Sequence, residues 1–158
     1  MIEHKKAAAL WAEYLLTLSD TERVGLPEPE VWGFGDNPEM ADELGALVKQ
    51  GIKTATADLV WVTEYESRPV PKAGDYSIIL DGVGDPLCII KTTEVTITPY
   101  EDVPADFAYD EGEGDRSLDY WRQAHWRYFS RRCDDIGRKP TLTMPVICER
   151  FRMVYRQT

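Results

Sequence analysis

Apolar residues recur at three- and four-residue intervals near the start of the chain, in the stretch AAALWAEYLLTL. Leu10, Tyr14 and Leu18 fall on one face at this spacing, which predicts an amphipathic helix over about residues 3–18. An acid and a histidine precede its lysines and no small-residue cleavage site follows, so we interpret this start as a helix rather than a signal peptide. A loop rich in proline and acidic residues comes next.

Two further helices are indicated by their capping residues. Asn37 is followed by a proline and by the amphipathic stretch EMADELGALVKQ, and Gly51 is placed to end this helix in a left-handed conformation. Ser117 precedes LDYWRQAHWRYFSRRC, in which Trp121, His125 and Phe129 form one stripe. Both segments are therefore expected to be N-capped amphipathic helices.

Strand patterns first appear at residue 75. DYSIILDG and PLCIIKTTEVTITPY are rich in β-branched residues and enclose turn residues, which predicts a hairpin with a long second strand. TLTMPVICERFRMVYRQT alternates apolar and charged residues and predicts a closing strand. The fold class is thus α+β, with helices flanking a small antiparallel or mixed sheet.

Composition narrows the class of protein. The chain has 158 residues, 43% hydrophobic and 29% charged, as expected for one globular domain that needs no disulfide or metal for its core. No apolar run approaches the roughly 20 residues that span a bilayer. Cys88, Cys133 and Cys148 show no metal-like spacing, and two lie in apolar runs, so we expect reduced thiols and a cytoplasmic location.

Charge is distributed unevenly. Residues 1–115 hold 8 Lys/Arg and 24 Asp/Glu, whereas residues 116–158 hold 10 and 4, within a net charge of −10. The acidic whole argues against indiscriminate nucleic-acid binding, which depends on neutralising phosphates. The Arg-rich final segment is either a local positive surface or a solvated helix face balancing nearby acids.

The short motif GIKTATADL places Lys53 three residues before Thr56. A lysine beside a threonine hydroxyl is a workable hydrolase pair, if burial brings the pKa of the amine down and the chain lets the two side chains meet. The alternative is a strand whose threonines reflect β propensity and whose lysine meets solvent.

Three other motifs carry candidate binding residues, each with a structural alternative. In WGFGD, Trp32 and Phe34 could stack on a base, or could pin a tight turn to the core while Asp36 caps the next helix. Glu111 and Glu113 lie in the acidic loop YDEGEGDRSL, whose crowded carboxyls could do acid–base chemistry or simply form a mobile loop. The remaining candidates are Asp115, in that loop, and Arg122 and His125, which either hold an anion together or divide into a surface cation and a core histidine.

Taken in order, WGFGD, ADEL…GIKTATA, GDYSIILDG, EGEGDRSLDYWRQAH and VICERF resemble the bacterial ASCH domain family over about residues 32–155. The resemblance implies a small β-barrel of the PUA type with helices outside it and a cleft beside it. Residues 1–31 resemble the N-terminal helical extension of the longer members, and residues 32–158 then form the ASCH domain. It also implies association with RNA or with a nucleoside or nucleotide.

Some members of this family remove the acetyl group from N4-acetylcytidine, and others are ribonucleases. The amidohydrolase pattern is a lysine, a threonine three residues on, and a glutamate in an acidic loop. The resemblance assigns these roles to Lys53, Thr56 and Glu113, with Glu111 as the alternative carboxylate. No cofactor or metal is expected, since His4 is the only histidine besides His125. A non-catalytic RNA-binding or small-molecule-sensing module is the other interpretation.

Overall fold

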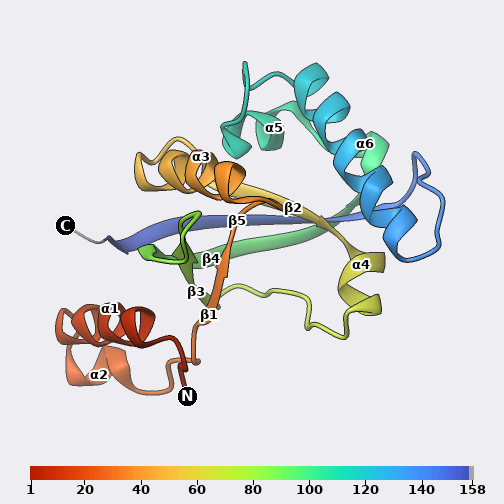
Figure 1. Cartoon of the computed structure of the whole chain (residues 1–158). Helices are drawn as coiled ribbons and strands as arrows, with labels where there is room; N and C mark the ends of the chain where they lie inside the picture. Colours follow the sequence, from red (N-terminus) through yellow and green to blue (C-terminus); the bar gives the residue numbers. More distant parts are fainter. Residues whose placement is uncertain (157–158) are drawn as a thin grey trace. The chain divides into compact units, whose positions relative to one another are not determined.

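The computed structural model describes residues 1–156, which Figure 1 traces from the red first helix to the blue last strand. The chain divides into two compact units: Met1–Gly51, Ala73–Thr92 and the chain from Phe151 belong to the first, and Ile52–Lys72 and Thr93–Arg150 to the second. One mixed sheet has the strand order β1-β3-β4-β5-β2. Its strands are β1 (Glu30–Gly33), β2 (Ala55–Leu59), β3 (Tyr76–Leu80), β4 (Pro86–Pro99) and β5 (Pro145–Arg156).

The first unit contains α1 (Lys5–Leu16), α2 (Asp20–Arg23) and α3 (Pro38–Lys49). The apolar face of α1 is buried against the hairpin of β3 and β4. The buried residues of this cluster are Ala7, Leu10, Tyr14, Tyr76, Ile78 and Ile89. Burial of this face removes apolar area from water and accounts for the helix better than propensity alone.

Helix α3 begins where the sequence predicts. The Asn37 side chain accepts the backbone N–H of Met40 at 2.8 Å, and a proline occupies the first turn. At the other end Gly51 has φ +78°, the left-handed conformation that closes a helix. In this unit β3 pairs antiparallel with β4 as a hairpin and parallel with β1.

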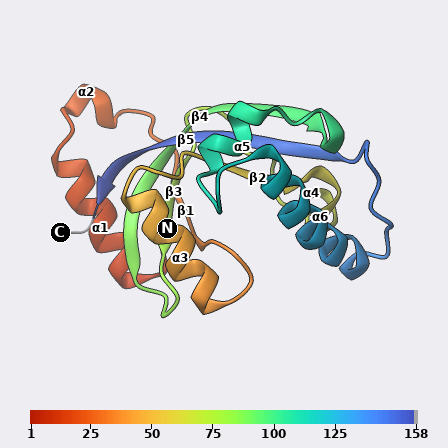
Figure 2. The same ribbon diagram turned by 90° about the horizontal axis from the view of Figure 1, so that it is seen from above.

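The second unit contains α4 (Val60–Tyr65), a short 3-10 helix (Tyr100–Asp102), α5 (Ala105–Glu111) and α6 (Leu118–Asp135). Ser117 accepts the Tyr120 backbone N–H at 3.0 Å and caps α6. Helix α5 contacts α6, as Figure 2 shows, and Phe107, Trp121 and Phe129 share one core. In this unit β2 pairs antiparallel with β5.

The α+β fold class, with a small mixed sheet and flanking helices, is confirmed. Five elements were not expected from the pattern: α2 within the predicted loop, β1 at the edge of the sheet, α4 after β2, and the 3-10 helix and α5 ahead of α6. Glu111 therefore ends a helix, whereas the sequence placed it in an acidic loop. The boundary at residue 31 between an extension and a domain stays a prediction. Within residues 1–156, no helix combines the length and the apolar character that crossing a membrane requires.

Candidate functional site

Lys53 lies in the segment that leads into β2, and only 1% of its surface is exposed. Its neighbour Thr54 donates a backbone N–H to the Asp110 carbonyl at 2.8 Å, which ties this segment to the last turn of α5. Moving an ammonium group out of water is costly unless it is paired and hydrogen-bonded. The segment therefore holds a buried cation that depends on partners within the second unit.

Two carboxylates supply those partners. Lys53 Nζ lies 3.2 Å from Glu111 Oε1 and 2.9 Å from Glu113 Oε2, and it also donates to the Glu111 carbonyl at 3.3 Å. The side chain of Glu111 is 2% exposed, whereas that of Glu113 is 21% exposed. The two ion pairs thus differ in access: one is sealed in the core and the other reaches the surface of the unit.

Gly112 makes this double contact possible. It ends α5 with φ +74°, and a Cβ at this position would lie 2.8 Å from the Ile52 carbonyl oxygen. A left-handed residue here reverses the chain direction at the helix end. Glu111, the last residue of α5, and Glu113, the first residue after the turn, both contact Lys53 as a result.

The second oxygen of Glu111 is held by α6. Trp121 Nε1–H donates to Glu111 Oε2, and His125 Nε2 lies 3.0 Å from the same oxygen. His125 Nδ1 lies 2.9 Å from the Trp121 carbonyl oxygen, and the two rings stack with centroids 4.1 Å apart. A carbonyl and an ionised carboxylate only accept hydrogen bonds, so this geometry favours the imidazolium form of His125, in which both ring nitrogens donate.

The pKa values of the buried groups agree with this assignment. Burial alone would lower the pKa of Lys53, but Glu111 and Glu113 outweigh burial and raise it above its ordinary value. Burial would raise the pKa of Glu111, but His125 and Lys53 hold it below its ordinary value. Burial would lower the pKa of His125, but Glu111 raises it. These directions favour a charged Lys53, a charged His125 and an ionised Glu111.

The same residues offer a set of possible metal ligands, because ligand atoms of Glu111, Glu113 and His125 lie within 4.8 Å of one another. A metal would need the lone pair of His125 Nε2, which carries the proton shared with Glu111. It would also compete with the Lys53 ammonium for both carboxylates. The donor set therefore fits an internal ammonium ion better than a divalent cation.

Thr56, the third residue of the predicted catalytic trio, lies in β2 and is half-buried. It is paired with Glu149 of β5, while its neighbours Ala55 and Ala57 pack with the core of the second unit. The structure thus brings together the predicted amine and carboxylate, with Glu111 as a third member. Participation of the Thr56 hydroxyl stays a prediction.

The aromatic motif lies in the first unit. Phe34 is buried, at 5% exposed, and packs against Phe151, while Trp32 is half-buried and contacts Phe34 edge to face with ring centroids 4.6 Å apart. These contacts agree with the interpretation in which both rings pin a turn to the core. Asp36 is exposed, and the cap of the next helix is Asn37 instead. Base stacking by these rings stays a prediction.

The last two predicted binding residues have partners of their own. Asp115 is exposed and accepts the Ser117 backbone N–H at 2.9 Å, so hydrogen bonds from Ser117 lower its pKa and it supports the start of α6. Arg122 donates from Nη2 to the Glu101 carbonyl at 3.0 Å. Although it lies one turn before His125, it thus contacts the 3-10 helix, and the structure does not join the two in one anion site.

Two residues of the site were not predicted to belong to it. Trp121 was assigned only to the apolar stripe, although its four-residue spacing from His125 could have indicated a shared partner. Arg116 donates to the carbonyls of Tyr109 at 2.9 Å and Ile52 at 3.4 Å, with its guanidinium 3.6 Å from the Tyr109 ring centroid. It fastens the loop that carries Glu113.

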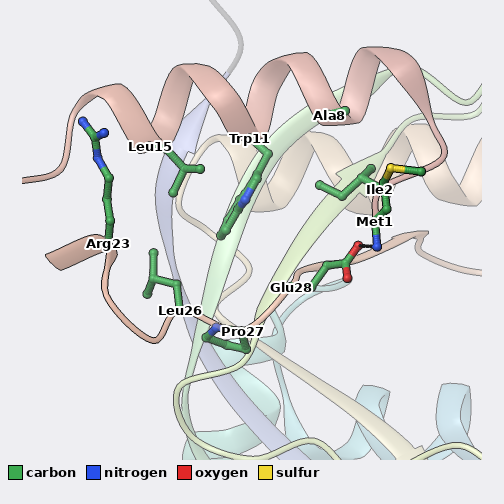
Figure 3. A pocket seen from close by; sticks show the side chains of 9 residues that line it. All are labelled: Met1, Ile2, Ala8, Trp11, Leu15, Arg23, Leu26, Pro27 and Glu28. Atoms are coloured by element: carbon green, nitrogen blue, oxygen red, sulfur yellow. Dashed lines mark ion pairs between the residues drawn. The ribbon is translucent and has the colours of Figure 1, made fainter. Parts of the chain in front are cut away.

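A separate hollow lies in the first unit, between α1 and the segment that follows α2 (Figure 3). It encloses about 450 Å³ and is mainly apolar, with Arg23 at one end and the ion pair of the Met1 amino group with Glu28 at the other. Its walls are formed by Met1, Ile2, Ala8, Trp11, Leu15, Arg23, Leu26, Pro27 and Glu28. None of the predicted site residues lines it.

Similarity to known proteins identifies the family. The family model of the ASCH domain matches residues 30–155 of this chain. An ASCH domain from Lactobacillus crispatus JV V101 is 29% identical, with a TM-score of 0.93 over 97% of this chain and 96% of that one. Protein EF3133 from Enterococcus faecalis V583 is 37% identical, with a TM-score of 0.84 over 96% of this chain and 90% of that one. The sequence has no match among curated proteins. The chain belongs to the ASCH domain family.

Proposed function

We propose that the chain binds a modified nucleoside or a segment of RNA and hydrolyses it at the Lys53–Glu113 pair. The observation that carries the proposal is a buried ammonium shared by two carboxylates, of which only Glu113 remains accessible. A preorganised cation stabilises negative charge that develops in a transition state, and a carboxylate beside it transfers protons. Family resemblance supplies the class of substrate.

The favoured reaction is removal of an acyl group from a base such as N4-acetylcytidine. Thr56 Oγ attacks the acetyl carbonyl carbon, and Glu113 takes the hydroxyl proton. The Lys53 ammonium, whose three N–H groups are engaged by Glu111 and Glu113, stabilises the oxyanion through its charge rather than by a direct hydrogen bond. Glu113 then gives the proton to the leaving amine as the carbon–nitrogen bond breaks, and water hydrolyses the acetyl-threonine ester.

This assignment of roles follows from the charge state of the site. A lysine acts as a base only when its amine is neutral, whereas Glu111 and Glu113 raise the pKa of Lys53 and keep it protonated. Lys53 is therefore assigned electrostatic stabilisation, and the proton transfers fall to Glu113. The sequence led us to expect a neutral Lys53 amine that activates Thr56. The charged side chain instead stabilises negative charge.

Ribonuclease chemistry is the less favoured variant. It would use Lys53 to stabilise a pentacoordinate phosphate, with a carboxylate or His125 moving protons. Both N–H groups of His125 are already engaged, by Glu111 and by the Trp121 carbonyl, so this ring is not free to serve as the acid. The net charge of −10 also favours a small substrate over a long polyanion.

The test incubates the protein with N4-acetylcytidine and, separately, with short single-stranded RNA. We expect release of acetate and cytidine, loss of turnover in Glu113→Gln and Thr56→Ala, and partial recovery in Thr56→Ser. Lys139→Met, an exposed charge change in the same unit, is the control and should leave turnover unchanged. Turnover that persists in Glu113→Gln would remove the carboxylate from the mechanism.

A binding module without chemistry is the second candidate, and one observation favours it. Exposed guanidinium groups of the second unit lie over aromatic rings: Arg138 is 4.3 Å from the Trp61 ring centroid and Arg131 is 5.8 Å from that of Tyr128. Such pairs are suited to stacking with bases and contacting phosphates. This candidate predicts saturable RNA binding that weakens steeply with salt and yields no product.

A further inference from the structure

The proposed reaction uses Lys53 and Glu113, but the structure has equally specific contacts at Glu111 that this chemistry does not use. Glu111 is sealed from solvent and receives three polar groups at its carboxylate: the Lys53 ammonium, the Trp121 indole N–H and the His125 ring. An unneeded buried carboxylate would be costly, since burial penalises its charged form. These contacts require an explanation.

We propose that Trp121 and His125 are positioning residues that hold Glu111 as a fixed anion beneath Lys53, leaving Glu113 as the carboxylate that meets the substrate. The inference rests on the proposed function and divides the labour between the two glutamates. It also assigns a role to α6, which the sequence motif Lys-x-x-Thr does not include.

Charge balance supports this division. With Lys53 and His125 protonated and Glu111 and Glu113 ionised, the four buried and half-buried groups are neutral together. Glu111 lies between the two cations and contacts both. Without the His125 cation, two carboxylates would share one ammonium, and the buried Glu111 would lose one of the two cations that contact it. His125 therefore helps to hold Glu111 as an anion beneath Lys53.

Hydrogen-bond direction supports it as well. Trp121 contacts Glu111 with its indole N–H and His125 with its own backbone carbonyl, and its ring stacks on the imidazolium. One residue thus fixes the carboxylate, the orientation of the histidine and the placement of its proton. The position of Glu111 Oε1, 3.2 Å from Lys53 Nζ, then fixes the ammonium.

Access separates the roles of the two glutamates. Glu111 ends a helix and is enclosed by α6 and by the segment before β2, whereas Glu113 lies in the turn beyond Gly112 and retains exposed surface. A proton acceptor must reach the substrate, and an anchor must not move. The geometry matches each carboxylate to one of these requirements.

The decisive variant is Trp121→Phe, which keeps an aromatic ring for the core and for the stack but removes the N–H donor. Trp126→Phe is the matched control, because Trp126 is a half-buried indole on the same helix that packs against the same core. We expect Trp121→Phe to lower kcat by about 10- to 100-fold. Loss of a hydrogen-bond partner that orients a metal ligand has an effect of this size in metalloenzymes, and Trp121 orients Glu111 in the same way. KM should change by less than the fall in kcat, and Trp126→Phe should leave kcat unchanged.

A second measurement needs no substrate. Nitrogen-15 NMR of the full chain should show both ring nitrogens of His125 protonated at pH 7, and a slowly exchanging ammonium signal from buried Lys53. In Trp121→Phe the exchange of that ammonium should accelerate, and in Trp126→Phe it should not. A neutral His125 in the native protein, or an unchanged Lys53 signal in Trp121→Phe, would overturn the positioning role whether or not any substrate is hydrolysed.

His125→Gln adds a readout in the active protein. Removing the cation should raise the pH at which activity is lost on acidification, because Glu111 gains a proton more easily without it. The charged groups that face this ring are Glu111 and Glu113. If His125→Gln loses activity on acidification at the same pH as the wild type, the inference is contradicted. If neither N4-acetylcytidine nor RNA is turned over while the NMR signals behave as expected, the proposed function fails and the positioning arrangement stands.

Discussion

Lys53 Nζ lies 2.9 Å from Glu113 Oε2, so a lysine with 1% of its surface exposed is paired with a carboxylate that is 21% exposed. The two residues are 60 positions apart in the sequence. The chain brings them together through a strand-leading segment on one side and the turn at the end of α5 on the other. A buried cation thus contacts an accessible anion, and this relationship underlies each of the predictions that follow.

Lys53→Met is expected to destabilise the fold strongly. The substitution preserves much of the side-chain volume but leaves Glu111 buried without its ammonium partner. Breaking a buried ion pair by removing one member typically costs about 3–5 kcal/mol. Urea unfolding followed by tryptophan fluorescence measures the change in the free energy of unfolding.

The matched control for this substitution is Lys139→Met, at an exposed lysine of the same unit, with an expected change of less than about 0.5 kcal/mol. A further variant tests the cause. In Lys53→Met combined with Glu111→Gln both members of this ion pair are neutral and His125 can release its proton, so the double variant should be more stable than Lys53→Met alone. Equal or additive losses would show that packing, rather than charge, explains the cost.

Glu111→Gln and Glu113→Gln should separate stability from activity. Glu111 is fully enclosed and its charge balances Lys53 and His125, so its amide leaves two buried cations with one carboxylate. We expect a large loss of stability in Glu111→Gln and a small one in Glu113→Gln. Thermal unfolding of both variants measures their stability, and turnover of N4-acetylcytidine measures their activity. The reverse order of stabilities would exchange the roles assigned to the two glutamates.

Much of the fold could be predicted because its signals are local. Asn37 and Ser117 cap their helices as their side-chain chemistry indicates, and the hairpin of β3 and β4 follows from β-branched residues around a turn. The unexpected elements have weak or misleading local signals. Strand β1 has only four residues, and α4, with the sequence VWVTEY, contains β-branched residues that favour a strand. Tertiary context determines both.

The site could be predicted only in part. Lys53, Glu113, Glu111 and His125 were all candidates, but a lysine in a strand-like segment normally indicates a solvated side chain. The burial of Lys53 depends on partners 58 and 60 residues away in the sequence, and a pattern of apolar and polar positions cannot predict contacts over such separations. Trp121 was hidden for a different reason: an aromatic residue on the apolar face of a helix is ordinarily core, and here it is core and hydrogen-bond donor together.

The stability of the protein should depend on pH through His125 and Glu111. The pKa of His125 is raised above 6.5 in the folded protein, so its contribution is fully present below pH 6.5 and is lost as the pH rises through the folded value. The pKa of Glu111 is lowered below 4.5, so its contribution is present above pH 4.5 and is lost on acidification through the folded value. Between these limits we expect a stability maximum on the mildly acidic side of neutrality.

Urea unfolding at a series of pH values measures this profile. In His125→Gln the decline that starts above pH 6.5 should be weaker than in the wild type, since the group responsible for it is absent. The decline on acidification should still begin near pH 4.5, but it should be smaller and end at a higher pH, because the folded pKa of Glu111 rises when it loses a nearby cation. An unchanged alkaline decline in His125→Gln would assign it to another group.

Gly112→Ala is expected to damage both the fold and the site. The residue has φ +74°, where any Cβ is strained, and the new Cβ would lie 2.8 Å from the Ile52 carbonyl oxygen. Gly137→Ala is the matched control, because Gly137 has φ +72° but nothing within 4 Å of its Cβ position. The control should lose about 1 kcal/mol from conformational strain alone. Gly112→Ala should lose more, because the turn must shift away from the segment before Lys53.

The same pair of variants links the turn to the chemistry. A displaced turn moves Glu111 and Glu113, which flank Gly112, relative to Lys53, so turnover should fall in Gly112→Ala but not in Gly137→Ala. Unfolding free energies and kcat measured on both variants give the comparison. If the two alanine variants lost stability equally and Gly112→Ala kept full turnover, the close approach to Ile52 would have no part in aligning the ammonium with its carboxylates. The expected result instead makes this glycine the point where the backbone conformation of the helix end determines the geometry of the ion pairs.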